Sequence, residues 1–81
     1  MIDLKIQVSM PKYGQTMEEG EVVKWRKKVG DSVKKGEVYL EIASDKTELE
    51  VESEYTGVMS EILVKEGAKV LCGTIIATIE V

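Results

Sequence analysis

The sequence predicts an all-β domain built from two similar halves. Apolar and polar residues alternate in short runs that glycines separate, which is the pattern of half-buried strands, and signals for helices are nearly absent. The chain also repeats itself when it is shifted by 37 residues. With 81 residues, 43% of them hydrophobic and 32% charged, it fits one small globular domain and has no room for a second.

The strands follow from the alternation, taken in chain order. Four runs alternate clearly between apolar and polar positions: residues 4–10, 38–42, 49–51 and 75–79. Residues 22–28 and 58–64 also read as strands, but their pattern does not say which face is inward. In the second of the four runs, Leu40 and Ile42 define one face, so we expect Tyr39 on the opposite face.

The internal repeat relates residues 20–42 to residues 57–79. Six residues are identical over these 23 aligned positions, and three of the matched pairs are glycines: Gly20 with Gly57, Gly30 with Gly67 and Gly36 with Gly73. Glycine tolerates the positive φ of tight turns, so we expect Gly30 and Gly67 to lie in equivalent turns. Two such halves, related by a pseudo-twofold axis, are expected to close into a flattened barrel or a sandwich of two small sheets.

The composition excludes several classes of function. With no histidine, the chain has neither a Ser-His-Asp nor a Cys-His site, and its one cysteine cannot form an internal disulfide or a multi-thiolate zinc site. The net charge of −4 argues against nucleic acid, and no apolar stretch approaches the ~20 residues of a membrane-spanning helix. No basic-then-apolar leader opens the chain. We therefore expect no metal, no nucleic acid and no membrane among its ligands and partners.

The charges are segregated along the chain. Residues 24–35 hold six basic residues and one acidic residue, a net charge of +5. Residues 41–54 hold six acidic residues and one basic residue, a net charge of −5. Either segment is compatible with an ordinary solvated strand face. The acidic segment is the more informative of the two, because its single basic residue is Lys46.

Lys46 lies in the sequence Ser44-Asp45-Lys46-Thr47, between two alternating runs. Serine and aspartate favour turns, so we expect a tight hairpin with the lysine at its tip. Taken alone, such a lysine is most simply a solubilising turn residue. Its acidic neighbours favour the charged ammonium, which makes the amine a poor free nucleophile but a good handle for another enzyme. The residues favour a modified lysine over a catalytic one.

Four blocks of sequence carry a family resemblance. They are MPKYGQTMEEG at residues 10–20, KVGDSVKKGE at residues 28–37, EIASDKTELEVES at residues 41–53, and Gly57-Val58 followed by Lys65-Glu66-Gly67. In this order and spacing they resemble the lipoyl domains of the acyltransferase component of 2-oxo acid dehydrogenase complexes, in the biotinyl/lipoyl attachment family. An Asp-Lys dipeptide alone would be a weak signal, but the four blocks together cover essentially the whole chain.

The resemblance implies a fold and a site. The fold would be a flattened β-barrel, a barrel-sandwich hybrid, of two four-stranded antiparallel sheets with pseudo-twofold symmetry. Lys46, flanked by Asp45 and Thr47, would be the cofactor-binding residue, carrying covalent lipoic acid attached by a lipoate ligase or lipoyl transferase. The loop from Pro11 to Glu19 would lie beside the lysine hairpin and help a partner to recognise the domain.

The resemblance also implies the partners. A thiamine-diphosphate-dependent decarboxylase would acylate the swinging arm, an acyltransferase catalytic domain would pass the acyl group to coenzyme A, and a dihydrolipoamide dehydrogenase would reoxidise the arm. Complexes for pyruvate, branched-chain 2-oxo acids and acetoin all remain open. The chain itself, residues 1–81, would be a single non-catalytic carrier domain, because the acyltransferase site relies on a histidine that is missing here. The parent chain would be a dihydrolipoyllysine-residue acyltransferase in the cytoplasm, or in the mitochondrial matrix of a eukaryote.

Two residues depart from the family's pattern. Tyr13 stands where an aliphatic residue is common, and Thr47 stands where a small or apolar residue is frequent. Neither change removes the lysine acceptor. Cys72, which the repeat aligns with Lys35 in a turn, is expected to be partly exposed, and we assign it no function.

Three other functions compete with the lipoyl carrier. A biotin carrier shares the architecture, but that family places methionine on both sides of its modified lysine. An unmodified barrel-sandwich module of a membrane-transport adaptor protein needs no lysine at the hairpin tip. A nucleic-acid-binding barrel would need exposed aromatic residues and a basic face, which the composition does not favour.

Overall fold

The computed structural model describes residues 4–13, 17–44 and 47–81, and within these ranges it contains strands and turns but no helix. The strands, in chain order, are β1 (Lys5–Ser9), β2 (Glu19–Trp25), β3 (Ser32–Val33), β4 (Val38–Ala43), β5 (Glu48–Glu52), β6 (Gly57–Ile62), β7 (Lys69–Leu71) and β8 (Ile75–Glu80). The described part of the chain thus offers no helix that is long and apolar enough to cross a membrane. The all-β prediction is confirmed.

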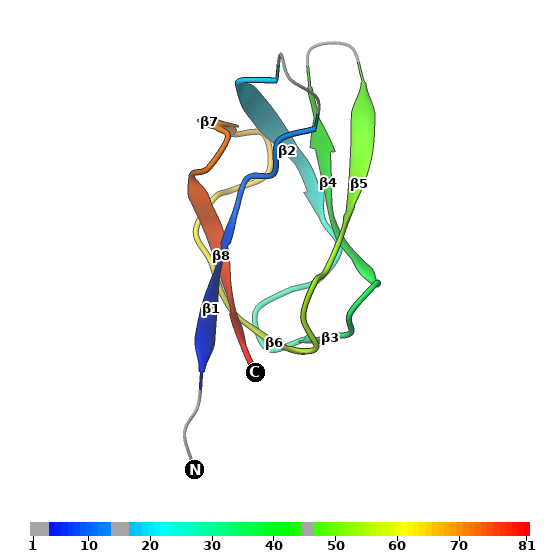
Figure 1. The fold of residues 1–81 in the computed structure, drawn as a ribbon, viewed down its shortest axis with the longest axis vertical. Helices are drawn as coiled ribbons and strands as arrows, with labels where there is room; N and C mark the ends of the chain where they lie inside the picture. The colour runs from blue at the N-terminus through cyan, green and yellow to red at the C-terminus, as the bar shows by residue number, and fades with distance from the viewer. Residues whose placement is uncertain (1–3, 14–16, 45–46) are drawn as a thin grey trace.

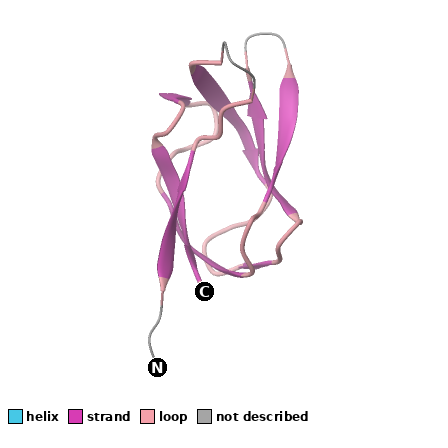
Figure 2. Ribbon diagram, viewed as in Figure 1, coloured by secondary structure: helices cyan, strands magenta, loops and turns pink. Residues whose placement is uncertain are grey.

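The strands form two four-stranded antiparallel sheets. One sheet has the order β1-β8-β6-β3, and the other has the order β5-β4-β2-β7. Figure 1 shows β1 and β8 on one side of the molecule and β2, β4 and β5 on the other, and Figure 2 shows how turns join the strands at both ends. The predicted flattened barrel of two four-stranded sheets is confirmed.

The two sheets are built in the same way. Exchanging β1 with β5, β8 with β4, β6 with β2 and β3 with β7 converts one strand order into the other. The register shifts also fall at equivalent positions, between Val22 and Lys24 in β2 and between Met59 and Glu61 in β6. These correspondences are the pseudo-twofold symmetry that was expected.

Equivalent glycine turns link the two halves. Gly30 and Gly67 have φ values of 96° and 92°, a conformation that residues with a Cβ rarely adopt. Each glycine donates its N–H to the other half of the molecule, Gly30 to the Met59 carbonyl at 2.8 Å and Gly67 to the Val22 carbonyl at 2.6 Å. The prediction of equivalent turns is therefore confirmed, and the turns also bind the halves to each other.

An aliphatic core lies between the sheets. Its largest fully buried side chains belong to Met10, Leu40, Ile42, Met59, Ile76, Ile79, Val22 and Val33. Each large aliphatic side chain contributes roughly 1.5–3 kcal/mol when it is removed from water. Since the chain has only one cysteine and hence no internal disulfide, the stability of the domain depends on this packing.

The prediction for Tyr39 from the simple alternation of apolar and polar residues is wrong. The sequence pattern placed it on the face opposite Leu40, yet both side chains are buried, with exposed fractions of 3% and 0%. The cause is a register shift between Val38 and Leu40 in the pairing of β4 with β5, because such an irregularity interrupts the two-residue period of side-chain direction. The Tyr39 ring packs near Trp25, with 6.1 Å between the ring centroids.

The molecule is elongated, and equivalent backbone hydrogen bonds lie at its two ends. The principal extents are 43 × 21 × 19 Å. At one end Ser44 N–H donates to the Thr47 carbonyl at 2.8 Å, and at the other end Val81 N–H donates to the Leu4 carbonyl at 2.8 Å. Figure 1 shows the upper ends of β4 and β5 far from the C-terminus.

Replacing Gly57 by alanine should destabilise the fold by about 1–3 kcal/mol, because overpacking of a fixed backbone cannot relax easily. A Cβ at this position would collide with the backbone carbonyl group of Glu80. Urea denaturation measures the effect. The control is Gly20→Ala at the repeat-equivalent position, where the nearest atoms are Met10 Sδ at 2.9 Å and Met17 Cε at 3.1 Å, the ends of flexible side chains. Equal losses of stability in both variants would contradict the view that the Glu80 backbone makes Gly57 the less tolerant position.

Replacing Tyr39 by phenylalanine should flatten the alkaline loss of stability. Burial raises the pKa of Tyr39 from 10.0 to about 12, with smaller contributions from Tyr13 and Glu54. The folded state therefore resists phenolate formation, and its stability should fall by about 2 kcal/mol as the pH rises from 10 to 12. Urea denaturation at several pH values tests this, with Tyr55→Phe as the control. A Tyr39→Phe variant with the same alkaline decline as the parent would contradict the prediction.

Candidate functional site

The hairpin between β4 and β5 is the element on which the predicted site depends. The two strands pair as far as Ala43 and Glu48, and the chain returns through residues 44–47. The Ser44 N–H and the Ser44 hydroxyl both donate to the Thr47 carbonyl, at 2.8 and 3.4 Å. The expected tight hairpin is therefore present at its base, where Thr47 is exposed.

Two of the three predicted site residues, Asp45 and Lys46, lie outside the described residues. Their position in the chain is nevertheless bounded on both sides. Ser44 precedes them and Thr47 follows them, and the hydrogen bond between these two residues joins the flanks of the connection. Lys46 as the attachment residue thus stays a prediction, and the structure describes only the strands β4 and β5 on either side of it.

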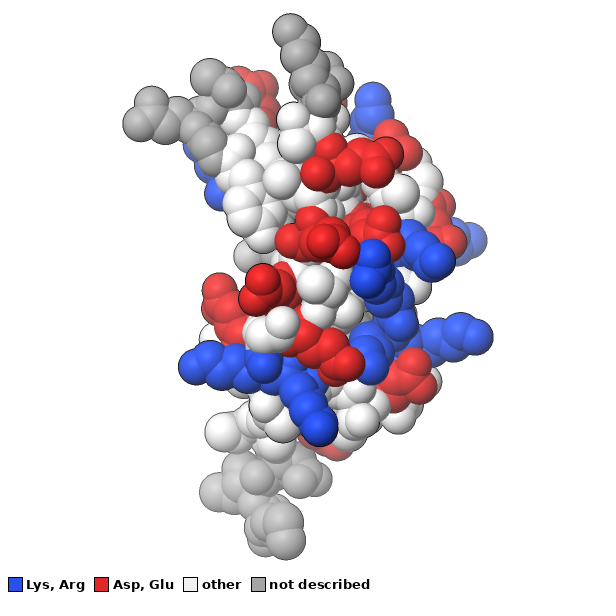
Figure 3. Space-filling model, turned by 90° about the vertical axis from the view of Figure 1, so that its right-hand side faces the viewer, with Lys and Arg blue, Asp and Glu red and all other residues white. Residues whose placement is uncertain are grey.

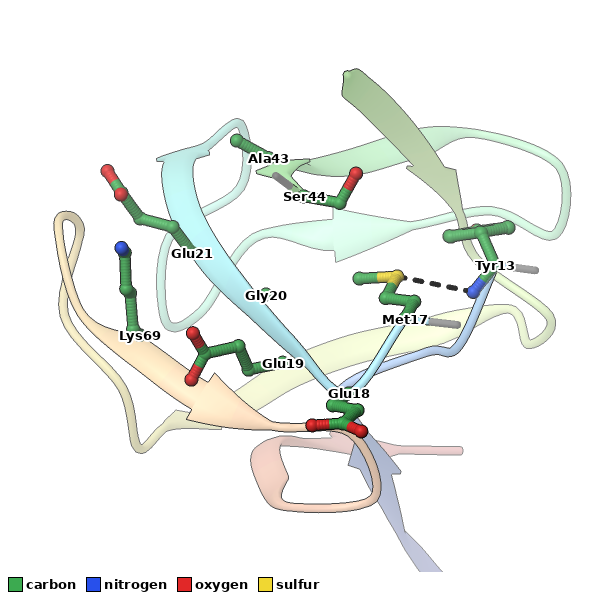
Figure 4. Close-up of a pocket in the computed structure, with 9 residues that line it drawn as sticks. All are labelled: Tyr13, Met17, Glu18, Glu19, Gly20, Glu21, Ala43, Ser44 and Lys69. Atoms are coloured by element: carbon green, nitrogen blue, oxygen red, sulfur yellow. Dashed lines mark hydrogen bonds between the residues drawn. The ribbon is translucent and has the colours of Figure 1, made fainter. Parts of the chain in front are cut away.

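A pocket lies between this hairpin and the loop that precedes β2. It has a volume of about 630 Å³ and is lined by Tyr13, Met17, Glu18, Glu19, Gly20, Glu21, Ala43, Ser44 and Lys69. Figure 4 shows Ala43 and Ser44 on one side of the pocket and Tyr13 and Met17 on another. From the segment between Pro11 and Glu19, Tyr13 and Met17 therefore line the same pocket as the base of the hairpin, as expected.

Met17 and Cys72 hold this loop in place. The Tyr13 N–H donates to Met17 Sδ at 3.3 Å, as Figure 4 shows, and the Met17 side chain is only 7% exposed. The single proton of the Cys72 thiol lies between two acceptors, because Sγ is 3.5 Å from the carbonyl oxygen of Pro11 and 3.6 Å from that of Met17. Cys72 is half-buried, in agreement with the expected partial exposure, but its support of the loop was not foreseen.

Arg26 joins the basic segment to the acidic one. Glu41 and Glu50 are directly paired across β4 and β5, which places like charges side by side. The Arg26 guanidinium bridges them, with Nε 2.7 Å from Glu41 and a terminal nitrogen 2.9 Å from Glu50. The hydrogen bond to Glu41, followed by the charge of that carboxylate, raises the pKa of Arg26. This pairing offsets the repulsion between the two carboxylates that face each other across the hairpin strands.

A second ion pair lies near the start of β4, but part of the acidic charge on β5 has no such partner among the described residues. Lys27 pairs with Glu37 at 3.1 Å, and the Lys34 N–H donates to the same carboxylate. The hydrogen bond from Lys34, followed by that from Lys27, lowers the pKa of Glu37. Figure 3 shows acidic and basic side chains next to one another on the face that carries β5. Glu48 and Glu52 on this strand take part in none of the ion pairs among the described residues, so β5 stays acidic.

The comparison with known families decides the membership of the chain. The Biotin_lipoyl family, described as "Biotin-requiring enzyme", matches residues 6–79. The chain belongs to this biotinyl/lipoyl family. Its solved neighbours include the lipoyl domain of the 2-oxoglutarate dehydrogenase complex from Azotobacter vinelandii. That domain has a TM-score of 0.75 and 35% identity, and the match covers 91% of this chain and 94% of the other.

Curated relatives of this biotinyl/lipoyl domain are longer proteins. The dihydrolipoyllysine-residue acetyltransferase component of the acetoin cleaving system of Bacillus subtilis is 47% identical over 76 residues, which are 94% of this chain and 19% of that protein. The dihydrolipoyllysine-residue succinyltransferase component of the 2-oxoglutarate dehydrogenase complex of Staphylococcus saprophyticus is 42% identical over 90% of this chain and 17% of that protein. The chain thus spans about a fifth of the length of these relatives.

Proposed function

We propose that residues 1–81 form one lipoyl carrier domain and that Lys46 carries lipoic acid in amide linkage. The observation that carries this proposal is the hairpin. β4 and β5 stay paired as far as the last residue of β4, Ala43, and the first residue of β5, Glu48, so only residues 44–47 remain to connect them. These four residues contain a single amine, Lys46, with Asp45 and Thr47 beside it. Such a connection offers a modifying enzyme one acceptor on a rigid support.

The described residues fit a covalent lipoyl group. An amide at the lysine requires only that the amine reach the active site of the attaching enzyme, and the hairpin base meets this need because Thr47 and Glu48 are exposed. When bound, the lipoyl group supplies a dithiolane that accepts an acyl group together with two electrons. The chain supplies reach and recognition: strands β4 and β5 fix the position of the hairpin, and the loop at Tyr13 and Met17 forms a neighbouring surface.

The partners of this carrier follow from its relatives. We infer a lipoate ligase or lipoyl transferase for attachment. A thiamine-diphosphate-dependent decarboxylase, an acyltransferase catalytic domain and a dihydrolipoamide dehydrogenase would then use the arm in turn, in a 2-oxo acid or acetoin dehydrogenase complex. The relatives named above are acyltransferase components of such systems. The domain by itself would be non-catalytic, within a cytoplasmic parent dihydrolipoyllysine-residue acyltransferase.

Biotin is the alternative cofactor, because the matching family is described by its biotin-requiring members. The similarity to a solved lipoyl domain over 91% of the chain favours lipoic acid instead. The residues on either side of Lys46 are aspartate and threonine, whereas the biotin carriers that the sequence resembles have methionine there.

The test of the attachment site is the intact mass of the chain after expression with a lipoate ligase, and separately with a biotin ligase. We expect the mass to increase by one lipoyl group and by no biotinyl group. Lys46→Arg should fold normally yet gain neither group, since a guanidinium is not a usable acyl acceptor. Lys35→Arg, in an exposed turn elsewhere, should be lipoylated like the parent chain. Full lipoylation of Lys46→Arg would show that another lysine is the acceptor.

Acylation by the decarboxylase should slow as ionic strength rises. Lipoylation removes the positive charge of Lys46 and takes residues 41–54 from a net charge of −5 to −6, while β5 keeps its exposed Glu48 and Glu52. Acidic surfaces accelerate encounter with a basic partner, and salt screens this attraction. The measurement is kcat/KM for acylation between low and high salt, and a rate that does not change would contradict electrostatic steering.

A further inference from the structure

A second pocket lies between strands β1 and β5. Each of these strands is at the edge of its own sheet. The pocket, here called the tyrosine groove, has a volume of about 390 Å³ and takes residues from β1, β4, β5 and the segments around them. Tyr13, Tyr39 and Tyr55 all line it, and these are the only tyrosines in the sequence. The groove therefore concentrates the phenol rings of the chain at one place.

The fold alone does not require these rings. The pseudo-twofold symmetry places Ile76 of β8 where β4 has Tyr39, and both positions are buried. An aliphatic residue thus serves the same packing role in the other half. Tyr13 and Tyr55 are 44% and 40% exposed, so much of each ring faces solvent and not the core.

The groove is also acidic. Glu52 and Glu54 line it, and no lysine or arginine does so among the described residues. Neither carboxylate takes part in an ion pair within the described part of the chain. Burial is the main cause that raises the pKa of Tyr39, and Tyr13 and Glu54 make smaller contributions. Aromatic faces beside unpaired carboxylates attract an organic cation.

We propose that the tyrosine groove binds an arginine side chain of a partner protein, with the guanidinium stacked on the exposed Tyr13 ring and paired with Glu54. Arginine suits this site better than lysine, because its flat and weakly hydrated group stacks on aromatic rings while it donates hydrogen bonds. Tyr13 also lines the pocket beside the Lys46 hairpin, so a protein that contacts the hairpin lies next to the groove. Only this last step, the identity of the partner as a protein that visits Lys46, rests on the proposed function.

Arginine binding is tested by titrating the isotope-labelled chain with Nα-acetyl-argininamide and following amide shifts by NMR. We expect saturable shifts at Tyr13, Glu54 and Tyr55, and none with the uncharged citrulline analogue. Glu54→Gln should weaken binding about fivefold. Glu61→Gln, which removes the same charge from an exposed position of β6, should leave binding unchanged. Equal binding of the citrulline analogue, equal losses in the two glutamine variants, or no saturable shift would overturn the proposal.

A second variant, Tyr13→Leu, tests the contribution of the Tyr13 ring to arginine binding. Tyr13→Leu restores the aliphatic residue common in the family and should weaken arginine binding, while its urea denaturation midpoint stays near that of the parent, because Tyr13 is exposed. Lys46→Arg should bind the probe like the parent chain. Loss of lipoylation with retained arginine binding, or the reverse, therefore separates a failure of the carrier proposal from a failure of this one. Undiminished binding by Tyr13→Leu and Glu54→Gln together would place the arginine elsewhere.

Discussion

The packing of the two sheets on one aliphatic core is the constraint on which the rest of this molecule depends. Buried residues from both sheets, such as Leu40 and Ile42 of β4 and Ile76 and Ile79 of β8, meet between them. In a chain of 81 residues with one cysteine, no disulfide adds to this packing. β4 lies inside its sheet between β5 and β2, and Val51 of β5 is itself a core residue, so the core holds both strands of the hairpin.

The pseudo-twofold symmetry explains where the hairpin lies. In one half the chain turns back after β4 to form β5, and in the other half the equivalent strand, β8, pairs with β1. The hydrogen bond that closes the hairpin, from Ser44 to Thr47, corresponds to the bond from Val81 to Leu4 at the opposite end. The base of the hairpin, at Ser44 and Thr47, therefore lies at the end of the domain that is opposite to Leu4 and Val81. For the proposed carrier this arrangement would be useful, because any chain that continues beyond those residues would lie away from the base of the hairpin.

The sequence predicts the parts of this structure that local rules determine. Gly30 and Gly67 were recognised from the repeat because a positive φ leaves few residue types to choose from. Tyr39 was placed on the wrong face, since a register shift is set by the pairing of two strands and not by either strand alone. The Arg26 bridge to Glu41 and Glu50 was missed for the same reason: its three residues lie on separate segments, and only the three-dimensional arrangement brings them together.

The distribution of charge suits a domain that must be recognised repeatedly and released each time. Arg26 neutralises one like-charge pair within the hairpin sheet, but Glu48 and Glu52 stay exposed on β5. Exposed ion pairs contribute at most about 1 kcal/mol each, so such carboxylates accelerate encounter more than they prolong a complex. A large apolar docking face would prolong it instead and slow the transfer to the next active site. Rigid strands that present weak, charged contacts beside a single amine meet both needs of the proposed carrier.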